Sequence, residues 1–179
     1  IYSNWIEVES FRGNVVYGLD FGFNNPTSLM KIGLYDGELY AENKIHKSGM
    51  TNSDLISAME ALDINDTIYC DSAEPQRIEE LRRAGYDAKP ANKEVRPGLD
   101  FVKRHKINIV DSPSTVKEIK TYKWREDKNG NVLDEPVKYN DHDMDAIRYG
   151  AYTKWFVPEA KFERVTLQPL HTSDERFLI

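Results

Sequence analysis

The sequence is poor in cysteine, with Cys70 as the single one among 179 residues. One cysteine excludes an internal disulfide and a zinc site built from several thiolates, and this suits a reducing compartment. No apolar run is long enough to span a membrane, and no secretory signal opens the sequence. With 40% hydrophobic and 30% charged residues, the composition is that of an ordinary globular protein of one domain.

Positive charge is not in excess either. The 24 Lys and Arg residues are outnumbered by 30 Asp and Glu, which gives a formal net charge of -6. The chain as a whole therefore has no field that attracts a polyanion. A nucleic-acid partner would have to be held by a local basic surface or by metal ions.

The order of the predicted elements is that of an α/β protein. Strands are expected over residues 15–19, 28–35 and 38–46, and Asp36-Gly37 is a strong hairpin signal between the last two. These strands are expected to be antiparallel, and the alternation of strands and helices after them favours parallel neighbours. Further strands are expected over 67–70, 86–90 and 107–110, and helices over 52–62, 76–84, 95–106, 114–122 and from 141 toward Trp155. The sequence thus predicts a mixed sheet flanked by helices.

One domain is expected to fill residues 15–157. Residues 1–14 carry no recognisable motif and are interpreted as a lead-in segment or the stump of a linker. Residues 158–179 show no clear period and are interpreted as a C-terminal tail, poorly ordered or docked on a partner. The first residue is Ile1 rather than Met, so we expect the sequence to be a piece of a longer protein.

Carboxylates stand at the ends of two predicted strands and at the start of the last helix. Asp20 follows the first strand, Asp71 follows the fourth, and Asp145 lies in the first turn of the helix. A lone aspartate at a strand end is commonly a turn residue, but the first and fourth strands can be neighbours in a mixed sheet. Converging carboxylates repel one another unless protons or hard cations are present, and oxygen donors select Mg²⁺ or Mn²⁺. The pattern predicts two such cations roughly 4 Å apart, the arrangement used for in-line attack on a phosphodiester.

The last acidic cluster reads Asp141-His142-Asp143-Met144-Asp145. His142 and Asp145 are three residues apart and share a helix face, whereas Asp143 is turned away from both. We therefore expect Asp145 to be a metal ligand and His142 to orient water, move a proton or contact a phosphate. Asp141 and Asp143 are expected to cap the helix and complement its dipole.

Three motifs carry a family resemblance: Gly-Leu-Asp-Phe-Gly at 18–22, Cys-Asp-Ser-Ala-Glu-Pro at 70–75 and Asp-His-Asp-Met-Asp-Ala-Ile-Arg-Tyr-Gly at 141–150. Together they resemble the acidic motifs of the nuclease domain of tailed-phage terminase large subunits, over residues 15–155. The resemblance implies an RNase H-like fold and a metal-dependent endonuclease that cuts concatemeric phage DNA during packaging.

Carried over by motif, the catalytic acids would be Asp20, Asp71 and Asp145, with His142 beside the last. The resemblance also implies certain partners: double-stranded DNA, an ATPase domain in the full-length protein, the terminase small subunit and the procapsid portal, with no membrane. It places the protein in the cytoplasm of the infected bacterial host, transiently at the portal. The sequence has no Gly-x-x-x-x-Gly-Lys-Ser/Thr loop, so the packaging motor is not within this stretch.

A local basic surface is predicted around residues 117–125. The basic residues there are Lys117, Lys120, Lys123 and Arg125, and Tyr122 and Trp124 are interleaved among them. They are the best local candidates for phosphate contact, although a solvated helix face is the commoner reason for such a cluster. Residues 123–137 predict an extra β-hairpin with Asn129-Gly130 as a type I′ turn. We expect this hairpin beside the active site, where it could gate or guide a duplex.

Other functions are compatible with parts of the pattern. A transposase, an integrase or a Holliday-junction resolvase would use the same acidic cage on the same fold. The Asp-Phe-Gly strand end also resembles the first phosphate motif of actin-like sugar kinases, but these need a second, Gly-rich phosphate loop that is absent here. A nucleic-acid-binding module that keeps the fold without cutting is a further alternative, against which the three acidic positions argue.

Overall fold

The structure is a computed structural model that describes residues 1–157. In chain order the elements are β1 (Trp5–Val8), β2 (Asn14–Asp20), β3 (Thr27–Tyr35), β4 (Glu38–Lys47), α1 (Asn52–Ala61), β5 (Ile68–Cys70), α2 (Pro75–Arg83), β6 (Ala88–Pro90), α3 (Val95–Lys103), β7 (Ile107–Val110), α4 (Pro113–Thr121), β8 (Trp124–Glu126), β9 (Val132–Pro136) and α5 (His142–Trp155). The predicted α/β class and order of elements are confirmed. The tail predicted over 158–179 lies outside the described residues.

Seven strands form one mixed sheet in the order β1-β7-β4-β3-β2-β5-β6. The central strands β2, β3 and β4 are antiparallel, as predicted, and β5, β6, β7 and β1 join them through parallel pairs. The carboxyl ends of β2, β4, β5 and β7 therefore meet at one edge of the sheet.

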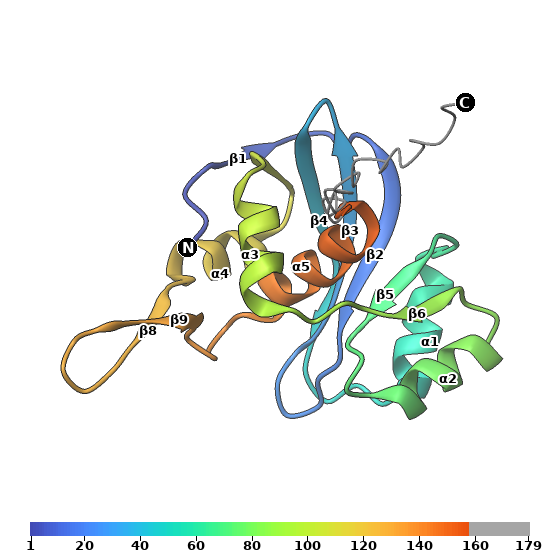
Figure 1. The fold of residues 1–179 in the computed structure, drawn as a ribbon. Helices are drawn as coiled ribbons and strands as arrows, with labels where there is room; N and C mark the ends of the chain where they lie inside the picture. Colours follow the sequence, from blue (N-terminus) through green and yellow to red (C-terminus); the bar gives the residue numbers. More distant parts are fainter. Residues whose placement is uncertain (158–179) are drawn as a thin grey trace, which may run out of the picture.

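Helices cover both faces of this sheet, with α3, α4 and α5 on one side and α1 and α2 on the other (Figure 1). Alternate residues of β2 place their side chains in the hydrophobic cores on the two faces of the sheet. Val16 packs into the core under α5, whereas Tyr17 and Leu19 pack into the core under α1 and α2. The apolar run that predicted a buried strand thus contributes side chains to both cores.

Strand β1 lies within residues 1–14, the segment interpreted from sequence as a lead-in. Trp5 pairs with Ile107 and Val8 with Val110, so β1 is an edge strand parallel to β7. The amino group of Ile1 donates a hydrogen bond to the carbonyl of Tyr122, and the side chain of Tyr2 is buried in the core. This segment is part of the packed fold.

The two hairpins differ in their turns. Asp36 and Gly37 both have positive φ, at 49° and 74°, as a two-residue type I′ turn requires. The type I′ turn predicted at Asn129-Gly130 is wrong, because Gly130 has a φ of +82° while Asn129 does not take a positive φ. The side chain of Asp127 accepts hydrogen bonds from the backbone N–H of Asn129 and Asn131, at 2.8 and 2.9 Å, and thereby stabilises a longer loop.

No helix within the described residues is long and apolar enough to cross a membrane.

Candidate active site

Two of the predicted acids lie at the ends of neighbouring strands. Strand β2 pairs with β5 in parallel register, with Leu19 opposite Cys70. Asp20 ends β2, and the backbone N–H of Asp71 donates a hydrogen bond to the carbonyl of Leu19 at 2.9 Å. The first and fourth strands predicted from the sequence are therefore neighbours, and their terminal carboxylates lie at the same edge.

Helix α5 brings the third acid to this edge because it lies unusually close to β2. A Cβ atom on Gly18 would lie 1.8 Å from the carbonyl oxygen of Ala146. On the helix side, a Cβ atom on Gly150 would lie 2.4 Å from a methyl carbon of Ile32. Two glycines thus set the distance between α5 and the sheet. At that distance the first turn of the helix, with His142 and Asp145, lies beside Asp20.

These residues line one open hollow of about 370 Å³. Asp20, Asp71, His142 and Asp145 all face it, so the structure brings together the four side chains predicted from sequence. Its other lining residues are Asn25, Pro26, Lys93, Lys138, Tyr139, Asn140, Asp141 and Tyr149.

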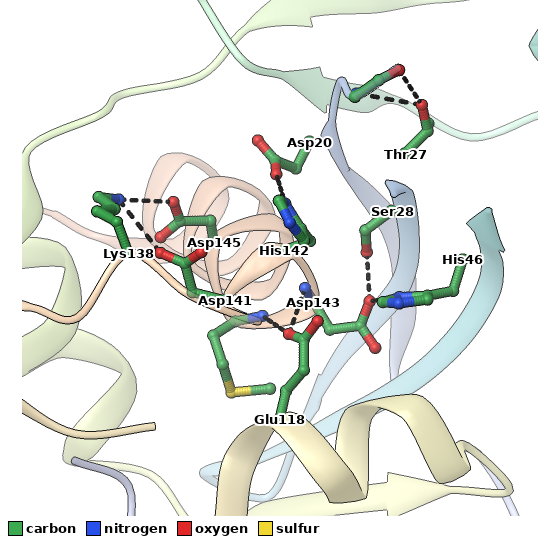
Figure 2. A network of polar contacts seen from close by, with 12 residues as sticks. Asp20, Thr27, Ser28, His46, Glu118, Lys138, Asp141, His142, Asp143 and Asp145 are labelled. Carbon is green, nitrogen blue, oxygen red and sulfur yellow. Dashed lines mark hydrogen bonds and ion pairs between the residues drawn. The ribbon is translucent and has the colours of Figure 1, made fainter. Parts of the chain in front are cut away.

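His142 is held directly by Asp20. Its Nδ1 atom lies 2.9 Å from Oδ2 of Asp20 (Figure 2). The hydrogen bond to this carboxylate raises the pKa of His142 above its ordinary value. The pKa of Asp20 is also raised, first by burial and then by the charges of Asp145 and Asp71, although the His142 contact opposes the shift. The carboxylates are therefore close enough to destabilise one another's charged forms.

Two lysines neutralise part of this negative charge. Nζ of Lys93 lies 2.6 Å from Oδ1 of Asp71. Nζ of Lys138 lies 3.2 Å from Oδ2 of Asp145 and 3.4 Å from Oδ2 of Asp141. Burial alone would lower the pKa of Lys138, but the charges of Asp145 and Asp141 outweigh it and raise that pKa. The hollow is thus a place where cations are stabilised.

Asp145 is also oriented from beneath by Arg148, whose side chain is only 2% exposed. The guanidinium donates to Oδ1 of Asp145 at 2.8 Å and to the carbonyl of Lys93 at 3.3 Å. Gly98 makes room for it, since a Cβ atom there would lie 2.9 Å from the Arg148 side chain. Asp145 is thereby held between a buried cation below and the hollow above.

The donor set fits a hard divalent cation. Asp20, Asp71, Asp141 and Asp145 offer carboxylate oxygens only, which Mg²⁺ and Mn²⁺ prefer. Burial, followed by the charges of Asp145 and Asp71, raises the pKa of Asp20, and bound positive charge would favour its ionised form.

The expected roles of Asp141 and Asp143 as helix caps are wrong in detail. Asp141 stands at the N-cap position of α5, but its side chain makes no capping hydrogen bond and faces the hollow. The cap comes instead from α4, because Oε2 of Glu118 accepts from the backbone N–H of Asp143 at 2.7 Å and of Met144 at 3.3 Å. Burial, followed by the charge of Asp143, raises the pKa of Glu118 to about 7.

Asp143 is fully buried and turned away from the hollow, as its helix position predicted. Its carboxylate accepts hydrogen bonds from Ser28, Asn43, His46, Ser114 and Thr115, at distances between 2.6 and 3.0 Å. These donors come from β3, β4 and α4. Asp143 therefore fixes the first turn of α5, with His142 and Asp145, against three other elements.

The predicted basic surface lies apart from the hollow. Lys117 and Lys120 lie on α4, Lys123 lies between the elements, and Arg125 lies on β8, all with exposed side chains. Arg125 pairs with Glu135 across the hairpin, and Lys120 lies 5.8 Å from the ring of Trp5. A role for these four residues in holding DNA stays a prediction.

Sequence reasoning missed Lys93, Lys138 and Arg148 at the site. Lys93 contacts Asp71 from a distant segment, whereas Lys138 lies close in sequence to its partners Asp141 and Asp145. No local pattern distinguishes either lysine from surface basic residues. The Arg148 position three residues after Asp145 is a weak signal, since that spacing places both on one helix face.

The mixed sheet, the helices on both faces and the acidic strand ends define the RNase H-like class of α/β domains. A family model described as the terminase RNAseH like domain matches residues 20–151, more than half of the chain. The chain belongs to this family, as the sequence motifs predicted.

Known relatives agree with this assignment. The PBSX phage terminase large subunit of Bacillus subtilis (strain 168) is 27% identical over 141 residues, which cover 74% of this chain and 33% of that protein. The chain thus spans about a third of the length of this curated relative.

Two solved structures show the same fold. The nuclease domain of the g2p large terminase from bacteriophage SPP1, with bound Mn, has a TM-score of 0.74 and 21% identity, over 84% of this chain and 96% of that one. The large terminase of a thermophilic bacteriophage, in complex with ATP-gamma-S, has a TM-score of 0.71 and 24% identity, over 86% of this chain and 43% of that one.

Proposed function

We propose that this chain is a metal-dependent endonuclease that cuts double-stranded DNA, as the nuclease domain of a phage terminase large subunit. The observation that carries the proposal is the hollow, where Asp20, Asp71 and Asp145 meet with oxygen donors only. The SPP1 nuclease domain, which has the same fold, contains bound Mn. Membership of the terminase family makes concatemeric phage DNA the substrate we propose.

Asp20, Asp71 and Asp145 would hold two divalent cations, with Asp141 as a further oxygen donor at the rim. Within residues 1–157, three candidate metal-ligand atoms lie within 4.8 Å of one another at one place only. That place is formed by His46, Glu118 and Asp143, which do not line the hollow. The proposed catalytic carboxylates are therefore more widely spaced than that group. When bound, the ions supply the positive charge that activates water and stabilises the leaving oxygen.

The chain's own side chains would then divide the remaining work. His142 is oriented by Asp20, faces the same hollow and can accept or donate a proton at Nε2. Lys138 and Lys93 pair with carboxylates that the ions would also use. With metal ions held by those carboxylates, both ammonium groups would be free to contact the DNA phosphates.

Plasmid cleavage with Mg²⁺, Mn²⁺ or chelator tests this function. Asp20→Asn, Asp71→Asn and Asp145→Asn should each abolish cleavage without unfolding the chain, because each removes an anionic ligand. Asp111→Asn is the matched control, since Asp111 is an exposed residue that follows β7 at the same edge and does not line the hollow. Cleavage in excess chelator, or by all three ligand variants, would rule out the proposed chemistry.

A second readout separates metal binding from cutting. Mn²⁺ should raise the melting temperature of the wild-type chain in a concentration-dependent way, by mass action on the folded state. Asp20→Asn should melt no lower than wild type without metal, because it relieves repulsion, and should respond less to Mn²⁺. Equal metal-induced shifts in the two proteins would contradict a shared site.

The proposed cellular setting follows from the family. The full-length protein would join this domain to an ATPase domain, and would work with double-stranded DNA, the terminase small subunit and the procapsid portal. It would act in the cytoplasm of the infected host, transiently at the portal. The large terminase of the thermophilic phage is more than twice as long as the part that this chain covers and binds ATP-gamma-S, in keeping with a second, nucleotide-binding part.

A further inference from the structure

A second polar cluster lies at the same edge of the sheet, outside the hollow. Its centre is the buried carboxylate of Asp143, and its most exposed titratable member is His46, at the end of β4 (Figure 2). Nδ1 of His46 lies 2.8 Å from Oδ1 of Asp143, while 26% of the His46 side chain remains exposed. The imidazole is thus anchored on one side and open on the other.

A β-bulge places His46 in this position. The pairing of β3 with β4 shifts between Leu29, which lies opposite Ile45, and Met30, which lies opposite Asn43, so that Lys44 is the extra residue. The shift turns both Asn43 and His46 toward α5, where each contacts Asp143. Bulges of this kind commonly redirect side chains next to active sites.

The register of the sheet also aligns His46 with the candidate catalytic acid. Asp20 pairs with Ser28, and Ser28 pairs with His46, so the three residues form one row across β2, β3 and β4. Strands are about 4.8 Å apart, which places His46 roughly 10 Å from Asp20 along this row. Backbone phosphates follow one another every ~3.4 Å along the axis of one DNA strand, so a strand cut at the hollow would bring a nearby phosphate to His46.

We propose that His46 contacts a backbone phosphate of the bound DNA, a few nucleotides from the cut, with Asp143 as the residue that positions its ring. This inference rests on the proposed function. Burial of the Asp143 carboxylate, which accepts five hydrogen bonds, costs desolvation free energy. Asp143 thereby fixes an imidazole that is 26% exposed, at the same edge of the sheet as the hollow.

The charged groups around His46 favour its cationic form. The hydrogen bond to Asp143 raises the pKa of His46, burial opposes the shift, and the charge of Glu118 on α4 adds to the rise. His142 on α5 lowers that pKa, and on its own strand Lys44 is already paired with Glu42, at 2.8 Å, while Lys47 is exposed. Ser28 on β3 carries no charge.

The test measures binding of a fluorescent DNA duplex in chelator as a function of salt, together with the kinetics of cleavage in Mn²⁺. His46→Gln keeps a hydrogen-bond donor for Asp143 but removes the cation. It should lower the salt slope of log K by about 0.9, the value for one phosphate contact, and raise KM more than it lowers kcat. Raising the pH through the His46 titration should weaken binding by the wild type more than by His46→Gln.

His105→Gln is the matched control. His105 also holds a hydrogen bond through Nδ1, to the carbonyl of Phe101 at 2.8 Å, but it precedes β7 at the opposite edge of the sheet. Its variant should bind and cut as wild type. Asp143→Asn should reproduce the loss of affinity if it melts as a folded chain, because the ring loses its anionic partner.

The outcomes distinguish the inference from the proposed function. An unchanged salt slope and KM in His46→Gln, with normal cutting by the wild type, would overturn the phosphate contact alone. A lower melting temperature with no change in slope would assign His46 to structure and overturn it as well. A wild-type chain that neither binds nor cuts DNA with metal would overturn both.

Discussion

A single methyl group added at Gly18 tests whether the spacing between α5 and β2 sets the site geometry. In Gly18→Ala the new Cβ atom would lie 1.8 Å from the Ala146 carbonyl oxygen and 3.1 Å from the Gly150 nitrogen. Both are backbone atoms, so α5 must move as a unit, by roughly 1.5 Å to reach ordinary van der Waals contact. Overpacking of this kind costs about 1 to 3 kcal/mol, occasionally more, which lowers Tm by about 2 to 4 °C per kcal/mol in a chain of this size.

Activity should fall further than stability. The shift separates His142 from Asp20, whose contact is 2.9 Å, and displaces Asp145 from the hollow. Displacements of ~1 Å at a reacting centre cost about 10²-fold in rate. Plasmid cleavage in Mn²⁺, at a temperature where the variant is folded by circular dichroism, should therefore drop by about that factor.

Gly33→Ala is the control for overpacking alone. Its Cβ atom would lie 2.3 Å from the carbonyl oxygen of Arg12, so it too must displace backbone. Gly33 pairs with Val15, at the end of β2 that lies far from Asp20. It should lower Tm but leave cleavage by the folded chain intact. Equal loss of cleavage in the two variants, or a wild-type Tm in Gly18→Ala, would refute the idea that this spacing builds the site.

Other perturbations probe charge at the site. The pKa of Glu118 is raised to about 7. Its protonated form therefore stabilises the fold fully below about pH 4.5, and this contribution to the free energy of unfolding is lost as the pH rises to 7. Glu118→Gln should remove this part of the pH dependence of the melting temperature, measured without metal. Lys138→Ala should tighten Mn²⁺ binding, measured by calorimetry, by up to about fivefold, because it removes a largely exposed cation that competes for Asp145. Lys89→Ala, which breaks the surface pair with Asp87, should leave Mn²⁺ affinity unchanged. His142→Ala should slow cleavage by about 10²-fold with Mn²⁺ affinity nearly unchanged, whereas Asp145→Ala should lose a bound ion; the reverse result would exchange their roles.

The sheet and helices were predictable because each carries a local signal. Alternation and β-branched residues marked β2 to β4, and Asp36-Gly37 marked their hairpin. Strand β1 was not predicted, because Trp5 to Val8 mix apolar and charged residues and become a strand only by pairing with β7, about a hundred residues away. The type I′ turn predicted at Asn129-Gly130 was wrong for a related reason, since the Asp127 side chain stabilises a longer loop than the dipeptide alone favours.

The site was predictable only in part. Asp20, Asp71 and Asp145 could be found because each follows a strand or opens a helix, positions that can be read locally. Glu118 could not be predicted as the cap of α5, since that contact joins two helices whose docking depends on the whole fold. Asp143 looked like an ordinary first-turn acid for the same reason, although its carboxylate accepts hydrogen bonds from three other elements.

Helix α5 depends on a side chain of another helix, Glu118 on α4, for the cap of its first turn. An isolated helix of this length is marginal in water, and α5 has no capping side chain of its own. The cap on its first turn exists only where α4 is docked beside it and places Glu118 there. The placement of His142 and Asp145 at the hollow therefore depends on α4 as well as on the strands, and a chain without α4 would lose this cap. Under the proposed function, nuclease activity would then require that α4 is correctly docked against α5.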